Sequence, residues 1–528
     1  LRGFTPDGYC SEGLGYWNYG FGHYVLLAET IRQATGGKLD LFALPAVKAP
    51  ATFGTRIQII EGIAPAFADC SVNAAPASPI LWYANLRFGL GLADYQQLDL
   101  RDTLGSVFEA MVYFTAQEAP RIAAAAAPAG PEIRSWFDHA GVLIGRPAPG
   151  SPCRMGVALK GGHNAEHHNH NDVGSYVVVV GERAVLLDPG AETYSARTFS
   201  SRRYESKLLN SYGHPVPVVA GQLQRAGADA KAAVLQADFT NQTDTLRLDL
   251  TSAYPVPDLQ RLERTFIYSR EGEGSLTITD RVDMKSPQTF GTALITRGTW
   301  QRQPDGSLLI TDVDQAVRVA IDAGGAEYAL QAEEIREDAP VRPTRIGINL
   351  AKPVTAATIT LTITPAAAPG MPENGSLLRN GGFEFGALGW EIPADGISSL
   401  STERAASGTH SLKIADNRRD AGSNVSSARF RCGGPGDFVI RGKAFHVSGE
   451  GVGIYVRYLN ARGRMLNEVD ANGNMAAVGS LTPTRGEWAP FAFPFRAPEG
   501  TVYLQVWIHS FNAAVVEAYL DDLEILRQ

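Results

Sequence analysis

The sequence has little charge, few cysteines and no long apolar run. Only 19% of its 528 residues are charged, against about 25% in typical soluble domains. With 47 basic and 55 acidic residues the formal charge is −8, and there is no basic tract, so we expect no nucleic acid partner. No run approaches the ~18 apolar residues of a membrane span. The hydrophobic fraction of 44% excludes a disordered chain and is enough for more than one core.

The four cysteines lie far apart and form no CxxC pair, which excludes a cysteine-based zinc framework and a dense disulfide scaffold. The sequence does not decide whether Cys10 and Cys70 form a disulfide bridge. The first residues, LRGFTPDGYC, lack the charged and apolar regions of a signal peptide, and there is no initiating methionine. We therefore expect a processed or truncated product.

The length predicts about three to four domains. Residues 1–116 read as helical because apolar residues recur three and four apart through 16–34, 78–92 and 101–117, with loops rich in Gly, Pro and Ala between these stretches. An Ala- and Pro-rich linker follows at 119–132. From about residue 135 short β-branched runs take over, such as SYVVVVGERAVLLDPG, which predicts a hairpin. A second linker spans 364–376. We predict an α+β multidomain protein with a helical domain at 1–134, an antiparallel β-sandwich at 135–368 and a further β unit at 371–528.

Four of the ten histidines lie within HNAEHHNHNDVGSY, residues 163–176. His170 is followed by Asp188 at the end of the strand AVLLDPG, and then by His214 in SYGHPVP. Two imidazoles and one carboxylate form a common ligand set for zinc, which often keeps a water in its fourth position. The alternative is a solvated, histidine-rich turn.

These three segments together resemble the β-sandwich part of the heparinase II/III-type polysaccharide lyases, in which an HxHxD motif, a DPG strand end and a later histidine occur in this order. The resemblance covers roughly residues 1–365 and implies an (α/α) helical toroid in the N-terminal part. It implies that His170, Asp188 and His214 bind a structural zinc. It also implies that His168 faces the substrate as a catalytic or carboxylate-neutralising group.

The stretch DGYCSEGLGYWNYGFGHY places polar side chains three or four residues apart, so in one helix they would share a face. Such a stripe suits a cleft that binds sugar. The alternative is that these aromatic side chains pack in the core. The residues are Tyr9, Glu12, Tyr16, Tyr19 and His23.

The same stretch resembles the family's EGxxY region, and Glu12 matches its glutamate. The family carries a catalytic tyrosine some fifty residues further on, but residues 52–70 contain none here. Either Tyr9, Tyr16 or Tyr19 replaces it, or the mechanism differs. A complete toroid is also longer than this region, so we expect an incomplete one.

The resemblance implies β-elimination at a uronic acid. The enzyme must neutralise the carboxylate, remove the proton at C5 and protonate the departing O4, and histidine and tyrosine suit these tasks. We expect His168 to act with a tyrosine of the first helix, preferably Tyr16 and otherwise Tyr9, and Glu12 to orient one of them. The expected substrate contacts are Tyr19, His167, Tyr194, Arg202 and Arg203. We expect the two arginines to bind substrate carboxylates; the alternative is that they lie in a solvated, charged turn.

The C-terminal segment, with NGGFE near its start and DDLEI near its end, resembles carbohydrate-binding modules of the galactose-binding-like jelly-roll type. Aromatic faces bind pyranose rings, although each such residue can instead belong to the core. The candidate platforms are Trp390, Trp488, Trp507 and Tyr455. Glu384 and Asp522 could hold a structural Ca²⁺.

The predicted partner is therefore an acidic polysaccharide, and the predicted location is secreted or periplasmic. The sequence does not decide whether the protein forms a homo-oligomer. Two other functions compete: a zinc-dependent hydrolase in which the metal activates water, and a non-catalytic glycan-binding protein that has lost the lyase machinery.

Overall fold

The computed structural model describes residues 3–60, 62–92, 95–98, 106–122, 132–370, 375–461, 463–471, 473–484 and 486–528. By its internal contacts the chain divides into two compact units, Leu1–Ala366 and Ala367–Gln528. The predicted helical and sandwich regions therefore pack together as one unit. Among the described residues, no helix has both the length and the apolar character needed to cross a membrane.

The predicted helices are present in the first unit, although residues 101–105 and 123–131 lie outside the described residues. The first helix is interrupted: a single π-helical turn, Trp17–Phe21, separates α1 from α2. Helix α3 was not predicted, because Pro50 and Gly54 obscure its pattern, yet a proline is tolerated in the first turn of a helix. The helices are α1 Gly13–Tyr16, α2 Gly22–Ala34, α3 Lys48–Arg56, α4 Ser78–Phe88 and α5 Val107–Thr115.

A five-stranded antiparallel sheet, in the order β1-β2-β3-β5-β6, forms the middle of the first unit. Its strands are β1 Arg134–Phe137, β2 Val142–Gly145, β3 Met155–Lys160, β5 Tyr176–Val180 and β6 Arg183–Leu186. All five residues of β5 are buried, because Tyr176, Val178 and Val180 face one core while Val177 and Val179 face another. Burial on both faces explains the unbroken apolar run in the sequence.

A nine-stranded and a four-stranded antiparallel sheet complete the first unit, in the orders β13-β14-β15-β18-β11-β10-β9-β8-β4 and β16-β17-β12-β7. The nine strands are β4 Gly162–Asn164, β8 Gly227–Phe239, β9 Thr243–Asp249, β10 Leu259–Ser269, β11 Ser275–Gln288, β13 Thr299–Arg302, β14 Leu308–Asp312, β15 Gln315–Asp322 and β18 Val354–Ala366. The four are β7 Val218–Val219, β12 Phe290–Thr296, β16 Tyr328–Glu334 and β17 Thr344–Leu350.

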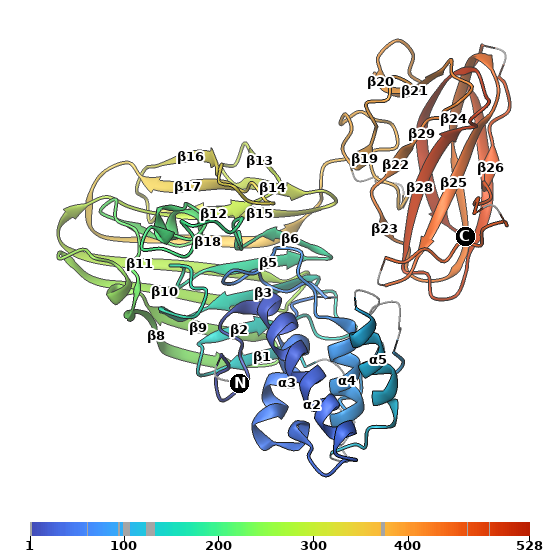
Figure 1. Ribbon diagram of the computed structural model, residues 1–528. Helices are drawn as coiled ribbons and strands as arrows, with labels where there is room; N and C mark the ends of the chain where they lie inside the picture. Colours follow the sequence, from blue (N-terminus) through green and yellow to red (C-terminus); the bar gives the residue numbers. More distant parts are fainter. Residues whose placement is uncertain are drawn as a thin grey trace. The chain divides into compact units, whose positions relative to one another are not determined.

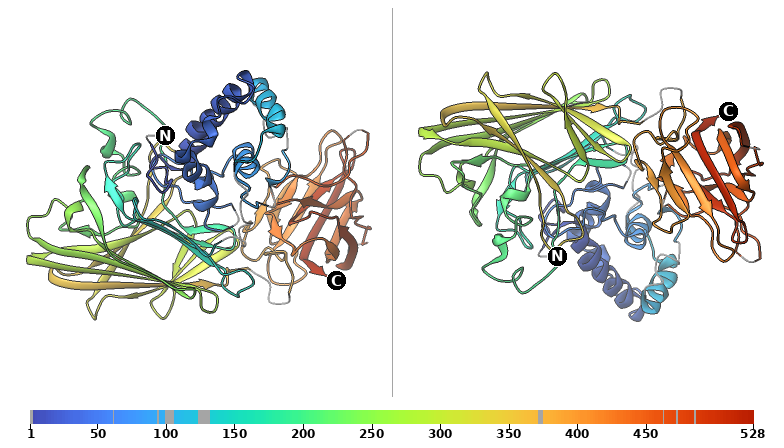
Figure 2. Two further views of the ribbon diagram at one scale, coloured as in Figure 1. Left: turned by 90° about the horizontal axis from the view of Figure 1, so that it is seen from below. Right: turned by 90° about the horizontal axis from the view of Figure 1, so that it is seen from above.

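Two hydrophobic cores hold these layers together. One lies between the five-stranded sheet and the strands of the larger sheets, and the other lies between the five-stranded sheet and the helices. Figures 1 and 2 show the blue helices on one side of the cyan strands and the green and yellow strands on the other. The loops that join β4 to β5 and follow β6 therefore lie where helices and sheets meet.

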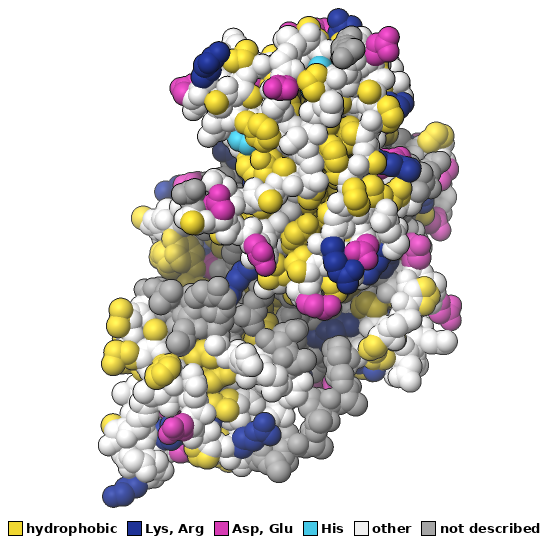
Figure 3. All heavy atoms as spheres, turned by 90° about the vertical axis from the view of Figure 1, so that its right-hand side faces the viewer, with side chains coloured by type: hydrophobic (Ala, Val, Ile, Leu, Met, Phe, Trp, Pro, Cys, Tyr) yellow, Lys and Arg dark blue, Asp and Glu magenta, His cyan; other side chains and the backbone are white. Residues whose placement is uncertain are grey.

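The C-terminal unit consists of two antiparallel sheets around a core of its own. One sheet contains β19 Trp390–Glu391, β22 Val425–Ser427, β28 Tyr503–Ser510, β25 Val452–Leu459 and β26 Gly479–Ser480, with β23 Phe430–Arg431 paired to β28. The other contains β20 Ser398–Ser401, β21 Ser411–Asp416, β29 Val516–Arg527, β24 Gly436–Gly449 and β27 Ala489–Ala497. Figure 3 shows one face of this unit, where hydrophobic side chains gather with few charged ones among them.

The prediction of an α+β chain with antiparallel sheets is confirmed in part, since the described residues form several antiparallel sheets and few helices. The partial toroid and the jelly roll stay predictions. The open question of a Cys10–Cys70 bridge is settled against it. Both thiols are buried and free, as are Cys153 and Cys432.

Candidate functional site

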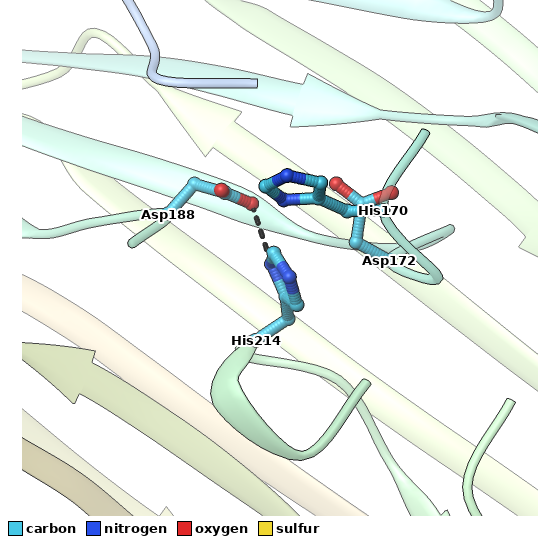
Figure 4. A group of neighbouring side chains, drawn as sticks. All are labelled: His170, Asp172, Asp188 and His214. Carbon is cyan, nitrogen blue, oxygen red and sulfur yellow. Dashed lines mark hydrogen bonds and ion pairs between the residues drawn. The ribbon is translucent and has the colours of Figure 1, made fainter. Parts of the chain in front are cut away.

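Four buried side chains converge between the sheets of the first unit, as Figure 4 shows. They are His170, Asp172, Asp188 and His214, and one ligand atom of each lies within 4.8 Å of the others. Three of them are the predicted zinc ligands, and Asp172 joins them. All four side chains are fully buried, with 0% exposure.

The buried Arg264 fixes the two loops that carry these residues. It forms an ion pair with Asp280 on the neighbouring strand, at 2.6 Å. Its guanidinium also donates to the carbonyls of Gly174 and Pro215, at 2.7 and 2.6 Å. Gly174 follows the histidine-rich turn and Pro215 follows His214, so one cation holds both halves of the site in register.

The outer nitrogen of each imidazole is held by a hydrogen bond, while the inner nitrogen faces the donor group. His170 donates from Nε2 to Asp69 at 3.0 Å, while its buried Nδ1 has no hydrogen-bond partner. His214 donates from Nε2 to the carbonyl of Leu208 at 2.9 Å, and its Nδ1 faces Asp188 Oδ2, also at 2.9 Å. Metal-ligating histidines usually donate their second N–H in this way.

The protonation of the group also suits a metal. Burial lowers the pKa of His170, which favours the neutral ring that binds metals. Burial alone would raise the pKa of Asp188, but the charge and hydrogen bond of His214 lower it. Burial alone would lower the pKa of His214, but the charge and hydrogen bond of Asp188 raise it, so a metal would have to displace the proton that this pair shares. With that proton gone, the group offers imidazole nitrogens and ionised carboxylates, a donor set suited to Zn²⁺.

Lys160 is the buried cation next to this group, and its ammonium pairs with Asp172 Oδ1. Burial alone would lower the pKa of Lys160, but the charges of Asp172 and Glu166 raise it. The other oxygen, Asp172 Oδ2, is buried without a hydrogen-bond partner. The carboxylates of Asp172 and Asp188 thus face a single ammonium, and the excess negative charge favours a bound cation.

A second, partly exposed cluster surrounds His168, two residues before His170. His168 Nδ1 lies 2.8 Å from Asp69 Oδ2, and the Tyr16 ring stacks on the imidazole with centroids 4.0 Å apart. The hydroxyls of Tyr16 and Tyr194 are 2.8 Å apart. Glu12 Oε2 lies 3.6 Å from His168 Nε2, an ion pair when the imidazole is protonated.

The carboxylate of Asp69 sets the direction of these hydrogen bonds. Burial alone would raise its pKa, but hydrogen bonds and charge from His170 and Arg203 lower it well below the usual range. An ionised carboxylate can only accept hydrogen bonds, so the Tyr194 hydroxyl donates a hydrogen bond to Asp69 at 3.1 Å. Burial and the neighbouring Tyr16 and Asp69 raise the pKa of Tyr194, which keeps that proton in place. Tyr16 must then donate to Tyr194.

Asp69 was not predicted as a site residue. It lies in the segment 52–70, where the resemblance led us to look only for a tyrosine. A single aspartate in a loop gives no spacing signal that distinguishes it from a solvated residue.

The prediction that Tyr9 acts in catalysis is wrong. Its side chain is 1% exposed and packs against Phe53 and Phe137, with ring centroids 5.6 and 5.2 Å away. Tyr19 lies at the opposite extreme, 67% exposed, with its ring against His23. The five-residue stripe does not form, because α1 begins only at Gly13 and the π-helical turn changes the spacing after Tyr16.

The arginines do not form the predicted clamp for substrate carboxylates. Arg202 is exposed and pairs with Glu205 at 2.8 Å. Arg203 turns inward, where it pairs with Asp69 at 2.6 Å and donates to the carbonyl of Asn169 at 3.0 Å. His167 is exposed on the same turn as His168, and its contact with substrate stays a prediction.

The aromatic candidates of the C-terminal unit separate into core and surface. Trp390 is buried in the core and donates from its indole to the carbonyl of Asn380, so the prediction that it stacks on sugar is wrong. Trp488 is half-buried against Phe445. Trp507 is half-buried and lies beside Tyr455, with centroids 4.6 Å apart.

The two predicted calcium ligands are engaged elsewhere. Glu384 accepts hydrogen bonds from the backbone N–H groups of Thr409 and His410, at 2.8 and 2.7 Å. Asp522 pairs with Lys443 at 2.9 Å. These contacts satisfy the oxygens that a Ca²⁺ ion would need, and the calcium site stays a prediction.

Solved structures share this fold. A heparinase III with methylated lysines matches 80% of this chain and 57% of its own, with a TM-score of 0.51 and 12% identity. The chain has a heparinase III fold. A mutant of heparan sulfate lyase HepC from Pedobacter heparinus matches 80% of this chain and 58% of its own, with a TM-score of 0.51 and 12% identity. The chain thus spans less than two thirds of the length of these lyases.

The other comparisons add less. No family model and no curated protein matches the chain. A family 16 carbohydrate-binding module matches 29% of this chain at 20% identity, with a TM-score of 0.22 that is too low to assign a fold. The resemblance noted in the sequence is therefore confirmed as a heparinase III fold, over chains that differ widely in sequence.

Proposed function

We propose that the protein is a polysaccharide lyase that cleaves a uronate-containing polysaccharide by β-elimination. One observation carries this proposal: a partly exposed imidazole, His168, stacks on Tyr16 and is held by a buried carboxylate next to a buried metal-type donor group. A positioned base, a phenol and a fixed loop are the components that proton abstraction at C5 requires.

The two ring systems divide the proton transfers between them. Asp69 accepts a hydrogen bond from the Nδ1–H of His168, so Nε2 carries the free lone pair and removes the C5 proton. Electrons from the C–H bond form the C4–C5 double bond as the C4–O4 bond breaks. Tyr16 turns its hydroxyl from Tyr194 toward the departing O4 and gives it the proton. Glu12, 3.6 Å from His168 Nε2, stabilises the imidazolium that forms.

In this proposal zinc is structural. When bound, it supplies positive charge and cross-links the loops of His170, Asp172, Asp188 and His214. The donor group is fully buried, and Asp69 lies between His170 and His168. A water-activating metal must keep a position open to substrate, so this burial favours the lyase over a zinc-dependent hydrolase.

The C-terminal unit is proposed to bind glycan. Trp507, Tyr455 and His509 form a group of adjacent rings on β25 and β28, with Trp507 and His509 stacked at 4.7 Å. Arg457 lies over the indole at 5.0 Å. A half-buried indole next to a guanidinium suits a sugar that carries a carboxylate or sulfate. A secreted or periplasmic location is part of the same proposal.

Incubation with a panel of polyuronates, including heparan sulfate, chondroitin and alginate, tests the lyase. We expect an increase in ultraviolet absorbance from unsaturated uronate on at least one polymer. His168→Ala should lower this rate by at least ~10²-fold. The control is His139→Ala, which removes an exposed histidine paired with Asp7. No absorbance on any uronate leaves the non-catalytic glycan-binding alternative.

A further inference from the structure

We infer that Asp69 is a positioning residue that couples the metal-binding group to His168 by holding both imidazoles in one tautomer. The inference rests on the proposed function for its kinetic consequence. Its structural part, the tautomer of His168, can be measured on the protein whether or not it turns over a polysaccharide.

The two oxygens of Asp69 serve different partners. Oδ1 accepts from His170 Nε2 at 3.0 Å and from Arg203 Nη2 at 2.6 Å. Oδ2 accepts from His168 Nδ1 at 2.8 Å and from the Tyr194 hydroxyl at 3.1 Å. One carboxylate therefore receives four donors and joins the buried donor group to the partly exposed cluster.

This arrangement fixes the proton of each ring. A carboxylate cannot donate, so His170 carries its proton on Nε2 and leaves Nδ1 for the metal. His168 carries its proton on Nδ1 and leaves Nε2 for substrate. An amide in place of the carboxylate has a single acceptor oxygen, so it cannot satisfy both rings at once.

The backbone on both sides of this contact is constrained. Ala68 and His168 both adopt left-handed conformations, with φ of 59° and 53°. Such conformations cost of order 1–3 kcal/mol at a non-glycine residue and persist where the surroundings enforce them. The hydrogen bond between Asp69 and His168 thus joins a strained residue, His168, to the neighbour of another, Ala68.

Two glycines let neighbouring segments clamp the loop of Asp69. A Cβ at Gly13 would lie 2.5 Å from the carbonyl oxygen of Phe67, and one at Gly190 would lie 2.3 Å from that of Cys70. Both glycines have positive φ, 84° and 69°. Asp69 is therefore held between the start of the first helix and the DPG turn, which begins at Asp188.

The test is Asp69→Asn in the full-length, zinc-loaded protein. In a serine protease, the corresponding change beside a catalytic histidine leaves the geometry intact but lowers kcat about 10⁴-fold through the wrong tautomer. Here we expect kcat on the active polyuronate to fall by ~10²–10⁴-fold with KM changed less than about threefold. Asp305→Asn, on an exposed turn where Asp305 pairs with Arg318, is the matched control.

Nitrogen-15 NMR of histidine-labelled protein reads the tautomer directly, with His168 assigned by its loss in His168→Ala. We expect an Nδ1–H tautomer for His168 in the wild type and a changed ring signal in Asp69→Asn. An Nε2–H tautomer in the wild type overturns the inference, even if the variant does not fold. So does an Asp69→Asn enzyme with wild-type kcat. A wild type that shows the expected tautomer but no lyase activity contradicts the proposed function instead.

Discussion

The ring of Tyr16 stacks on the ring of His168, with centroids 4.0 Å apart and an interplanar angle of 26°. The phenol and the imidazole therefore face the same side of the cluster. They come from the first helix and from the histidine-rich turn, 152 residues apart in the sequence. In the proposed β-elimination, the stack places the acid beside the base.

Substituting the two tyrosines separately should identify the acid. Tyr16→Phe keeps the stack but removes the proton destined for O4, so we expect kcat to fall by at least ~10²-fold. Tyr194→Phe removes only a donor to Asp69 and an acceptor for Tyr16, which should cost about tenfold. Steady-state kinetics on the active polyuronate measure both. Equal losses would mean that the two hydroxyls act as one unit, and a larger loss for Tyr194→Phe would exchange their roles.

Removing the metal should destabilise the first unit. A buried ion that cross-links loops stabilises only the folded chain, so treatment with a strong chelator should lower Tm by at least ~5 °C. Elemental analysis should find one zinc per chain in the wild type and none in His214→Ala. Asp172→Asn should weaken zinc binding by about tenfold or more.

The control for these variants is His139→Ala, which should keep its zinc. An unchanged Tm after complete removal of metal would contradict a structural role. Activity that is lost on chelation without any change in Tm would favour the hydrolase.

Glu29 on α2 should make the stability of the helical layer depend on pH. Its carboxylate is buried and accepts hydrogen bonds from Arg32, Gln33 and Tyr83. Burial alone would raise its pKa, but these bonds lower it. Because the folded pKa is depressed, the stabilisation is fully present above the unfolded pKa of about 4.3 and is lost as the pH falls through the folded pKa.

We therefore expect Glu29→Gln to lower Tm most at neutral pH, with the gap to the wild type closing below about pH 4. Thermal unfolding across this range measures it. A gap that stays constant with pH would show that packing, not charge, is what the substitution removes.

Trp507→Ala should weaken polysaccharide binding by the C-terminal unit. Loss of the half-buried indole should raise Kd about tenfold, equivalent to ~1.4 kcal/mol. Affinity electrophoresis of the full-length protein in gels that contain the polymer measures this. Phe385→Ala, which removes an aromatic that is 54% exposed in the same unit, is the control. Equal retardation of wild type and Trp507→Ala would contradict the platform.

Much of the fold could be predicted because the strands carry local signals. The run at 177–180 is buried on both faces, and the residues of β9 alternate between buried and half-buried, so each pattern matches its burial. The β unit predicted at 371–528 likewise consists of strands, among them β21, β24, β25, β27, β28 and β29. Helix α3 was missed because its proline and glycine are local signals against a helix.

The site could be predicted only in part. His170, Asp188 and His214 converge because their motifs lie in turns and at strand ends that the sheet topology brings together. Tyr9 was misassigned because α1 begins only at Gly13, so a helical count of three and four does not extend back to it. Arg203 and Asp69 satisfy each other across 134 residues, and no local pattern in the sequence reveals such a pair.

The most direct test of the account is the mass of the products released from a polyuronate that the wild type degrades. Elimination predicts oligosaccharides that are lighter by one water than hydrolysis products and carry an unsaturated uronate at the new end. His168→Ala should release almost none of them. Saturated, hydrated products would contradict the lyase and favour metal-activated water.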